Sequence, residues 1–447
     1  MPGSLGDYCT YAEVQVLDRQ ESRLATLKIY LGADMVGDFN IRRNKIYTVT
    51  CTIHNFSASG DQRVTIEDAV IPVLANCGMV VPGEAVTFDV GDRITKARTG
   101  APALTIDWTK GNDYVPVVIW QDVQGLVKEI SYDKSKGYVT VETDKSKGSG
   151  NAVVGLYPAG TTTSNYTDKD CLWSWHVWVT DYRPDGTKDY GLGENSYAAV
   201  DGGQVHTYGA KFMTAVKAVT PTKNRVIMDR NLGATAALYA NASGNNYPTW
   251  GLFYQWGRKD PFPKATNAND SKTSQTVWKG DGSSTTGFPV SIETAGNASA
   301  ACRKPHVFYS GTSSTSYDWQ SPQQNAAWGD KAEKSVYDPC PEGWRVAPNG
   351  TWSDFGRSNF PFNGSSASIN GGRLYTAGSV KAWYPAPGYR YYASGALRYV
   401  GDLGYSWSST VAASGYSAHD LYFDTQSLLP TNTNYRAYGL QVRCLQE

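Results

Sequence analysis

Short runs of Val, Ile, Thr and Tyr, interrupted by Gly, Pro, Asn and Asp, recur along almost the whole chain and constrain its fold more than any other feature. Gly and Pro account for 66 of the 447 residues, and long stretches with apolar residues at helical spacing are nearly absent. Short β-branched and aromatic runs bounded by turn residues are typical of strands. The sequence therefore predicts a mainly β protein, and its length predicts several domains.

Changes in composition and in the spacing of the expected strands divide the chain into three expected domains. Residues 1–58 contain two expected strands, near 25–31 and 45–53, which are too few for an independent core. We expect them to be the C-terminal strands of a larger sandwich, completed by the following domain or by a strand from another subunit. Residues 59–183 have the strand spacing of an immunoglobulin-like β-sandwich. The linker "RPDGTKDYGLGENS" then leads into residues 187–447, where we expect long loops on a small β scaffold.

The segment "CLWSWHVWVTDY", residues 171–182, is apolar at almost every position. As a strand it places Trp173 and Trp175 on one face, and His176 and Trp178 on the other. We expect both faces to be buried, in a core or at a domain junction. An aromatic sugar-binding platform is the alternative.

Charge and hydropathy argue against nucleic acid and membrane as partners. The 41 basic and 41 acidic residues cancel, and the last 73 residues carry five Lys or Arg against four Asp or Glu. No basic stripe therefore marks a nucleic-acid track. No apolar run reaches the roughly 18 residues of a membrane span. No signal peptide is visible at the N-terminus, which indicates either a mature or trimmed chain or a cytoplasmic one.

Motifs for catalysis, cofactor binding and metal ligation are missing. The sequence has no GxSxG, HExxH, P-loop or complete GxGxxG. The seven cysteines form no CxxC pair, and the five histidines (54, 176, 206, 306 and 419) lack ligand spacing. We therefore expect no enzymatic activity, no metal and no cofactor.

Tyrosine is concentrated at the C-terminal end. Residues 375–447 contain 11 tyrosines, about 15% of the segment, whereas the preceding 374 residues contain 19. Tyr provides rigid amphipathic contact area at low entropic cost, and the intervening Ser, Gly and Asn provide adaptable hydrogen bonds. The mixture is typical of a binding surface. Packing of these rings between domains is the alternative.

Within this end, "AHDLYFDTQ" alternates between apolar and polar residues. A period of two places Leu421 and Phe423 inward and Asp420, Tyr422 and Asp424 outward. We expect Trp407 and Val442 to belong to the same buried frame as Leu421 and Phe423, with exposed residues between them.

Several stretches resemble known families. "YLGADMVGDFNIRRNKIYTVTCTI" resembles the closing strands of the fimbrillin family of Bacteroidetes surface pili. "GNAVVGLYPAG" with "CLWSWHVWVTDY" resembles the accessory sandwich domain that follows fimbrillin modules in large tip proteins. The stretches "VIMDRNLGA", "WGLFYQWGRKDPFP", "DPCPEGWRVAPNGTWSDF" and "YSWSSTV…NYRAYGLQVRC" resemble, in the family's order, the Fibrobacter succinogenes major paralogous domain, which has a C-type-lectin-like α+β fold.

The lectin-like resemblance implies a short helix from about Asn349, with Trp352 and Phe355 on one face against the terminal strand. It also implies a disulfide between Cys340 and Cys444, which we expect to be the only one; two unrelated thiols are the alternative. The calcium and sugar motifs of true C-type lectins are absent, so the fold is implied without calcium-dependent sugar binding. Formylglycine-generating enzymes have a related fold, but they need reactive cysteines, and here a bridge would occupy the two candidates.

A second resemblance concerns the binding surface. Lectin-fold tip proteins diversified by adenine-directed retroelements carry their variable region at this C-terminal site. The ligand-binding residues that this resemblance implies are Tyr391, Tyr392, Arg398, Tyr399, Asp402, Leu403, Tyr405, Asp420, Tyr422 and Asp424.

These resemblances predict a non-enzymatic adhesin or display protein at the tip of a fimbrium, outside the cell. Its variable ligand would be a protein or glycan on another cell or a phage surface. Its N-terminal strands would contact other pilus subunits by β-strand addition, with no nucleic-acid partner and no direct membrane span. The alternative is a structural pilus subunit whose Tyr-rich end mediates assembly.

Overall fold

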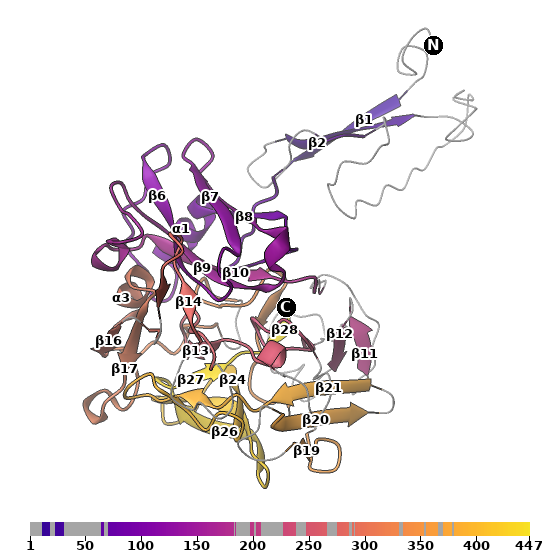
Figure 1. The fold of residues 1–447 in the computed structure, drawn as a ribbon, viewed down its shortest axis with the longest axis vertical. Helices are drawn as coiled ribbons and strands as arrows, with labels where there is room; N and C mark the ends of the chain where they lie inside the picture. The colour runs from indigo at the N-terminus through magenta and orange to yellow at the C-terminus, as the bar shows by residue number, and fades with distance from the viewer. Residues whose placement is uncertain are drawn as a thin grey trace. The chain divides into compact units, whose positions relative to one another are not determined.

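The computed structural model describes the strands 11–17, 23–30, 64–66, 197–200 and 203–206, and residues 70–182, 184, 227–237, 247–265, 275–285, 288–289, 291–329, 334–352, 355–364, 370–377 and 380–447. These residues form a mainly β, multidomain structure with several separate sheets, which confirms the expected fold class (Figure 1). The chain divides into two compact units, residues 1–72 and 73–447. The boundaries of the three expected domains stay a prediction.

The described residues of the N-terminal unit include an antiparallel sheet. Its strands, in spatial order, are β1 (Tyr11–Leu17), β2 (Arg23–Tyr30) and β3 (Val64–Ile66). β2 matches the strand expected near 25–31, whereas the strand expected near 45–53 lies outside the described residues.

Two sheets of the second unit pack face to face as a sandwich. The larger sheet has the order β15 (Ser284–Thr285), β14 (Val277–Trp278), β6 (Tyr114–Gln121), β9 (Gly150–Pro158), β10 (Trp173–Val179) and β4 (Cys77–Val80). The smaller sheet has the order β5 (Ala85–Asp89), β8 (Tyr138–Thr143) and β7 (Val127–Asp133). Their facing side chains form a sandwich core, in which Phe88 of β5 stacks on Trp175 of β10 with ring centroids 5.3 Å apart.

Helix α1 (Val90–Thr99) follows β5 directly. The carboxylate of Asp89 accepts a hydrogen bond from the backbone N–H of Asp92, and such a cap favours the switch from strand to helix. Val90, Ile94 and Ala97 recur at helical spacing and lie in the sandwich core.

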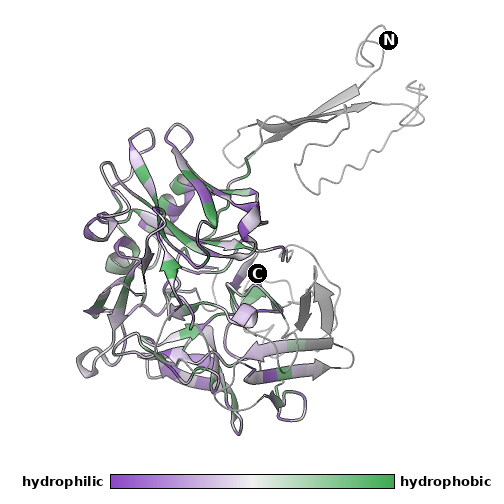
Figure 2. Cartoon of the chain, in the orientation of Figure 1, coloured by the Kyte–Doolittle hydropathy of each residue, from purple (hydrophilic) through white to green (hydrophobic). Residues whose placement is uncertain are grey.

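Strand β10 is buried along its whole length, which confirms the expected two-sided burial. Its Trp173 and Trp175 face the sandwich core, whereas Trp178 lies in a second, central core with Trp250 and Trp256. Figure 2 shows hydrophobic positions among the strands of the sandwich. The sandwich and the C-terminal half of the chain therefore share a core across this sheet, and β14 extends the same sheet by pairing with β6.

The C-terminal half consists of small sheets linked by long loops. One sheet has the order β13 (Phe253–Gln255), β27 (Gly439–Gln441), β22 (Tyr389–Arg390) and β23 (Leu397–Arg398). Two others are β19 (Phe362–Asn363), β20 (Gly372–Ala377) and β21 (Val380–Pro385), and β24 (Gly404–Val411), β25 (Ser417–Phe423) and β26 (Leu428–Tyr435). The pairs are β11 (Tyr197–Val200) with β12 (Gly203–His206), β16 (Ser291–Thr294) with β17 (Val307–Ser310), and β18 (Trp344–Val346) with β28 (Cys444–Gln446). Helix α3 (Ala298–Arg303) precedes β17.

Cys340 and Cys444 form the disulfide that the resemblance implies, with Cα atoms 6.0 Å apart. It lies beside the antiparallel pair β18 and β28, where Val346 is opposite Cys444. Cys77, Cys171 and Cys302 are free and buried, and Cys9 and Cys51 lie outside the described residues.

The helix expected from about Asn349 is absent from the described part of that segment. Residues 349–352 form turns, and residues 353–354 lie outside the described residues. The Thr351 N–H donates to the carbonyl of Pro348, a three-residue spacing typical of a turn. Trp352 and Phe355 are nevertheless buried in a third core with Phe360. Both rings are therefore buried although residues 349–352 form turns.

Candidate functional site

The buried frame of the C-terminal end is as expected. Trp407, Leu421, Phe423 and Val442 are at most 1% exposed. Leu421 and Phe423 lie in the third core, whereas Trp407 lies in the central core. Both faces of the sheet β24–β25–β26 are therefore partly covered by protein, and only part of the second face reaches solvent.

The tyrosines of this end join into one continuous network of ring contacts. We define the tyrosine cluster as Tyr317, Tyr389, Tyr391, Tyr392, Tyr399, Tyr405, Tyr416, Tyr422, Tyr435 and Tyr438. Centroids of neighbouring rings lie 4.4 to 6.3 Å apart, within the range of favourable aromatic pairs. The network unites five tyrosines predicted as ligand-binding with five that were not.

Tyr438 occupies the middle of the network. Its ring contacts those of Tyr389, Tyr391 and Tyr392 at interplanar angles of 88°, 66° and 77°. Edge-to-face pairs place the positive edge of one ring against the negative face of another. The rings therefore fix one another's orientation, so the surface is largely pre-formed.

The cluster lies between core and solvent. Tyr399 and Tyr416 are 52% and 39% exposed, and the other eight members are half-buried. Burial raises the pKa of Tyr405, Tyr422 and Tyr438 above the ordinary value. These hydroxyls therefore stay protonated at neutral pH and can both donate and accept hydrogen bonds.

A cation lies at one edge of the cluster. The exposed Arg398 guanidinium lies 3.9 Å from the ring centroid of Tyr391, a cation–π contact. The Tyr391 ring lies 4.4 Å from that of Tyr392. A hydrogen bond with Tyr391 is the main reason why the pKa of Tyr392 rises to about 12. The structure thus brings these three predicted residues together.

Two cluster members have a backbone conformation that non-glycine residues rarely adopt. The φ angle is +59° at Tyr317 and +53° at Tyr399. Such residues persist only where their surroundings hold them, and they are concentrated at functional sites. The strained backbone at both tyrosines therefore favours a functional role for the cluster.

Asp420 was expected to face outward, and that prediction is wrong. Asp420 is 1% exposed, and its Oδ2 accepts a hydrogen bond from the side-chain amide of Asn434. It lies opposite Trp407 of β24, so it points toward the covered part of the sheet. Burial raises the pKa of Asp420 to about 7, although hydrogen bonds from Asn434 and Asn432 oppose this effect. Strand alternation was predicted correctly, but the second face is not open to solvent here.

The polar candidates Asp402, Tyr422 and Asp424 are half-buried. The hydroxyl of Tyr422 donates to Oδ2 of Asp424 at 2.5 Å, and the N–H groups of Gln426 and Ser427 donate to Oδ1. Burial alone would raise the pKa of Asp424, but these hydrogen bonds outweigh it and lower the pKa. Asp424 therefore orients Tyr422 instead of presenting a free carboxylate. Asp402 and Leu403 follow Tyr399 in a turn that begins at the Tyr399 carbonyl.

Sequence reasoning missed five cluster tyrosines. Tyr389, Tyr416, Tyr435 and Tyr438 lie inside the Tyr-rich segment, so local enrichment was a signal that could have included them. Tyr317 lies 72 residues before Tyr389 and has no such signal. Only the folded chain brings its ring to 4.4 Å from that of Tyr435.

Metal-ligating groups do not gather anywhere in the described part of the chain, where no three His, Cys, Asp or Glu side chains could hold an ion together. His176 is buried, and its Nε2 lies 3.0 Å from Oδ1 of Asn151. Burial lowers the pKa of His176 to about 3 and that of His306 to about 4. Both imidazoles are therefore neutral at physiological pH.

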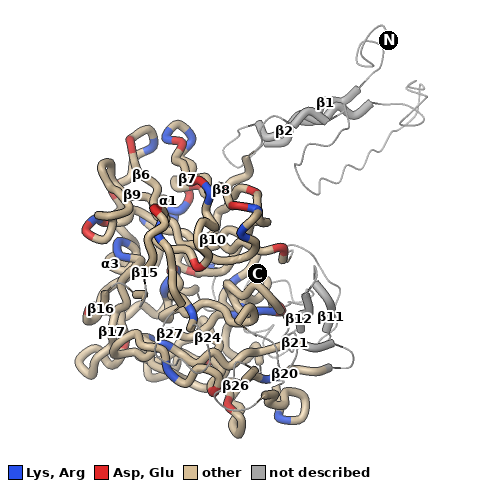
Figure 3. Tube along the Cα trace, viewed as in Figure 1, with Lys and Arg blue, Asp and Glu red and all other residues tan. Residues whose placement is uncertain are grey.

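Charged residues of both signs are interspersed along the described chain (Figure 3).

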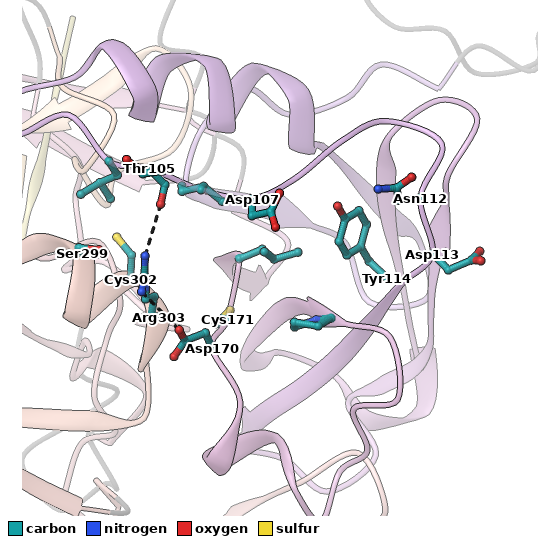
Figure 4. Close-up of a pocket in the computed structure, with 14 residues that line it drawn as sticks. Thr105, Asp107, Asn112, Asp113, Tyr114, Asp170, Cys171, Ser299, Cys302 and Arg303 are labelled. Atoms are coloured by element: carbon teal, nitrogen blue, oxygen red, sulfur yellow. Dashed lines mark hydrogen bonds and ion pairs between the residues drawn. The ribbon is translucent and has the colours of Figure 1, made fainter.

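A cavity of about 490 Å³ lies between the sandwich and helix α3. Figure 4 shows Arg303 at its wall, donating to the Thr105 carbonyl at 3.5 Å and pairing with Asp170 at 3.4 Å. Asp170 is exposed, as is Arg303 itself. Burial raises the pKa of the nearby Cys171 and Cys302 thiols to about 12, so both are protonated at neutral pH. No residue of the tyrosine cluster lines this cavity.

Fold and site together define a mainly β, multidomain protein with a tyrosine-lined surface on its C-terminal sheets. Residues 2–51 match a family model described as a domain of unknown function, DUF4906, which is found in Bacteroidetes fimbrillin-like proteins. This match indicates a fimbrillin-like surface protein and a surface or extracellular location. Neither a curated protein nor a solved structure matches the chain. Within the described residues, no helix has both the length and the apolar character that a membrane crossing requires.

Proposed function

We propose that the chain is a non-enzymatic adhesin or display protein of a pilus tip that binds its ligand through the tyrosine cluster. The observation that carries this proposal is the continuous network of ten tyrosines, of which eight are half-buried and two are well exposed. Tyr is enriched at binding hot spots, because one side chain offers both a large apolar face and a hydroxyl. The C-type-lectin-like fold and retroelement diversification belong to the same proposal.

Pre-organisation supports binding over a purely structural role. Edge-to-face contacts at Tyr438, the hydrogen bond from Tyr422 to Asp424 and the backbone strain at Tyr399 all fix side chains before any ligand arrives. Fixing side chains in advance reduces the entropic cost of association. A surface needed only for internal packing would not leave Tyr399 52% exposed in a strained conformation.

The chemistry of the surface favours a protein or a glycan as ligand. It combines aromatic edges and hydroxyls with one guanidinium, Arg398, and the carboxylate of Asp424 is already bonded to Tyr422. Such a surface forms apolar contacts and hydrogen bonds without depending on opposite charge. We propose a ligand on another cell or on a phage surface, and other pilus subunits as partners of the N-terminal strands by β-strand addition.

Screening the full chain on protein and glycan arrays tests the proposal. The full chain is needed because a fragment such as 187–447 would cut through the central core that β10 shares with Trp250. The double variant Y399A/Y416A removes the two most exposed rings. Its matched control is Y132A, which removes a half-buried tyrosine of the sandwich that contacts Tyr114.

We expect wild type and Y132A to bind the same array ligand and Y399A/Y416A to lose at least tenfold in affinity. Equal binding by all three proteins would contradict the proposal. Incorporation of the chain into a polymer through its C-terminal end, without any array ligand, would instead favour the structural pilus subunit.

A further inference from the structure

Arg436 follows directly after a cluster tyrosine in the sequence, and its side chain is completely buried. Its Nη1 donates to Oδ2 of Asp318 at 3.2 Å, and its Nη2 donates to Oδ1 of Asn325 at 2.6 Å and to the carbonyl of Gly415. The guanidinium also lies 4.5 Å from the ring centroid of Trp256. One side chain thus joins several segments that are far apart in the sequence.

Three of the segments that this guanidinium joins contain a cluster tyrosine, and in each segment that tyrosine is adjacent in sequence to the residue that takes part in the hydrogen bond. The adjacent pairs are Tyr317 with Asp318, Tyr416 with Gly415, and Tyr435 with Arg436 itself. The Tyr435 ring stacks on Tyr317, with centroids 4.4 Å apart and planes 24° apart. It lies 6.3 Å from the ring of Tyr416. These three rings are therefore anchored through one buried cation.

The backbone at Tyr317 needs such an anchor. Ser316 and Tyr317 have φ angles of +52° and +59°, which non-glycine residues adopt only where the surrounding structure holds them. The Tyr317 N–H donates to the carbonyl of Thr312 at 2.8 Å, and its carbonyl accepts from the N–H of Ala437 at 3.3 Å. The ion pair with Arg436 holds the same segment at Asp318, the residue after Tyr317.

Stability alone does not account for an arginine here. Apolar residues of similar volume often replace a buried ion pair with no loss of stability, because burying the charges offsets their attraction. A rigid guanidinium, however, directs several hydrogen bonds at fixed angles, which neither lysine nor methionine can do. The bonds of Arg436 to Asp318, Asn325 and Gly415 use this property.

We infer that Arg436 is a positioning residue of the tyrosine cluster, setting the relative placement of Tyr317, Tyr416 and Tyr435. The inference rests on the proposed function for its biological meaning. Its test measures ring placement and uses no ligand, so the two can fail separately.

The test places 3-fluorotyrosine at position 317 of the full chain and records its ¹⁹F resonance, which responds to stacking on Tyr435. The variant Y435A gives the resonance of the unstacked ring. R436K keeps the positive charge but lacks the planar guanidinium with its several N–H donors. R436M/D318L removes both charges together. R443K is the control, because Arg443 is equally buried and donates to Oδ1 of Asn231 and to the carbonyl of Trp383, which are not members of the cluster.

We expect the ¹⁹F resonance in R436K and R436M/D318L to move toward that of Y435A, and the resonance in R443K to stay at the wild-type position. We expect R436M/D318L to unfold near the wild-type temperature, so that lost stability cannot explain the moved resonance. Wild-type resonances in both Arg436 variants would overturn the inference. A displaced resonance together with the absence of any array ligand would support the positioning role and remove only the proposed function.

Discussion

The hydroxyl of Ser174 donates a hydrogen bond of 2.6 Å to Oδ1 of Asp260, across the junction between β10 and the C-terminal half of the chain. Nζ of Lys259 lies 2.8 Å from the same carboxylate oxygen and also donates to the carbonyl of Ser174 at 3.0 Å. All three side chains are at most 3% exposed. This buried polar group joins the sandwich to the segment that contains Trp256.

Removal of the cation from this group should destabilise the second unit. We expect K259M to lower the free energy of unfolding by about 3–5 kcal/mol, because it leaves the Asp260 carboxylate buried without its counter-ion. The control is K304M, which breaks the partly exposed pair between Lys304 and Glu293 and should cost at most about 1 kcal/mol. Urea unfolding of both variants measures the difference, and equal midpoints would contradict the assignment.

The disulfide between Cys340 and Cys444 should form in oxidised protein. The two cysteines are 104 residues apart, so the chain-entropy estimate for closing this loop is roughly 4–5 kcal/mol. Non-reducing peptide mapping should recover the two peptides linked, and should recover Cys77, Cys171 and Cys302 as free thiols. Free Cys340 and Cys444 in an oxidised sample would show the pairing to be wrong.

Tyrosines of the cluster should differ in their contribution to stability according to burial. Replacing Tyr405 by Ala should lower the free energy of unfolding by about 3 kcal/mol, because its half-buried ring packs against the central core. The Tyr399 ring is 52% exposed, so Y399A should stay within about 0.5 kcal/mol of wild type. Thermal-shift and urea measurements compare the two variants. A Y399A loss as large as that of Y405A would place Tyr399 in the core and not on a binding surface.

Asp420 should make stability depend on pH near neutrality. Its pKa is raised by burial from 3.8 to about 7, so the folded state binds the proton more tightly than the unfolded chain. Its contribution to stability is therefore full below about pH 4 and is lost as the pH rises through about 7.

The variant D420N lacks this titration. Between pH 5 and pH 8, wild type should lose on the order of a few kcal/mol relative to D420N, as measured by urea unfolding at both pH values. Burial also raises the pKa of Asp318 and Asp338 to about 6, but both carboxyls are present in the two proteins and their effects cancel in the difference. Parallel pH profiles for wild type and D420N would contradict the raised pKa.

Local sequence patterns predicted what depends on neighbouring residues along the chain. The strands β2 and β10 lie where apolar and β-branched runs indicated them, because strand formation follows from short runs and their turn residues. Two-sided burial of Trp175 and Trp178 was also predictable, since alternate residues of a strand point to opposite faces and both sets here are apolar. Alternation likewise identified Leu421 and Phe423 as core residues.

Tertiary structure decided which surfaces remain exposed and which distant residues meet. The period of two at Asp420 is correct, but a sequence pattern does not show that the central core covers part of the second face of that sheet. Tyr317 likewise carries no local signal, and only the folded chain brings its ring to that of Tyr435 and the neighbouring Asp318 to Arg436. The sequence by itself thus determined the strands, the buried frame and the concentration of tyrosine. The folded chain decided which tyrosines form the cluster, because ring contacts and buried ion pairs depend on distances in space between residues far apart in the chain.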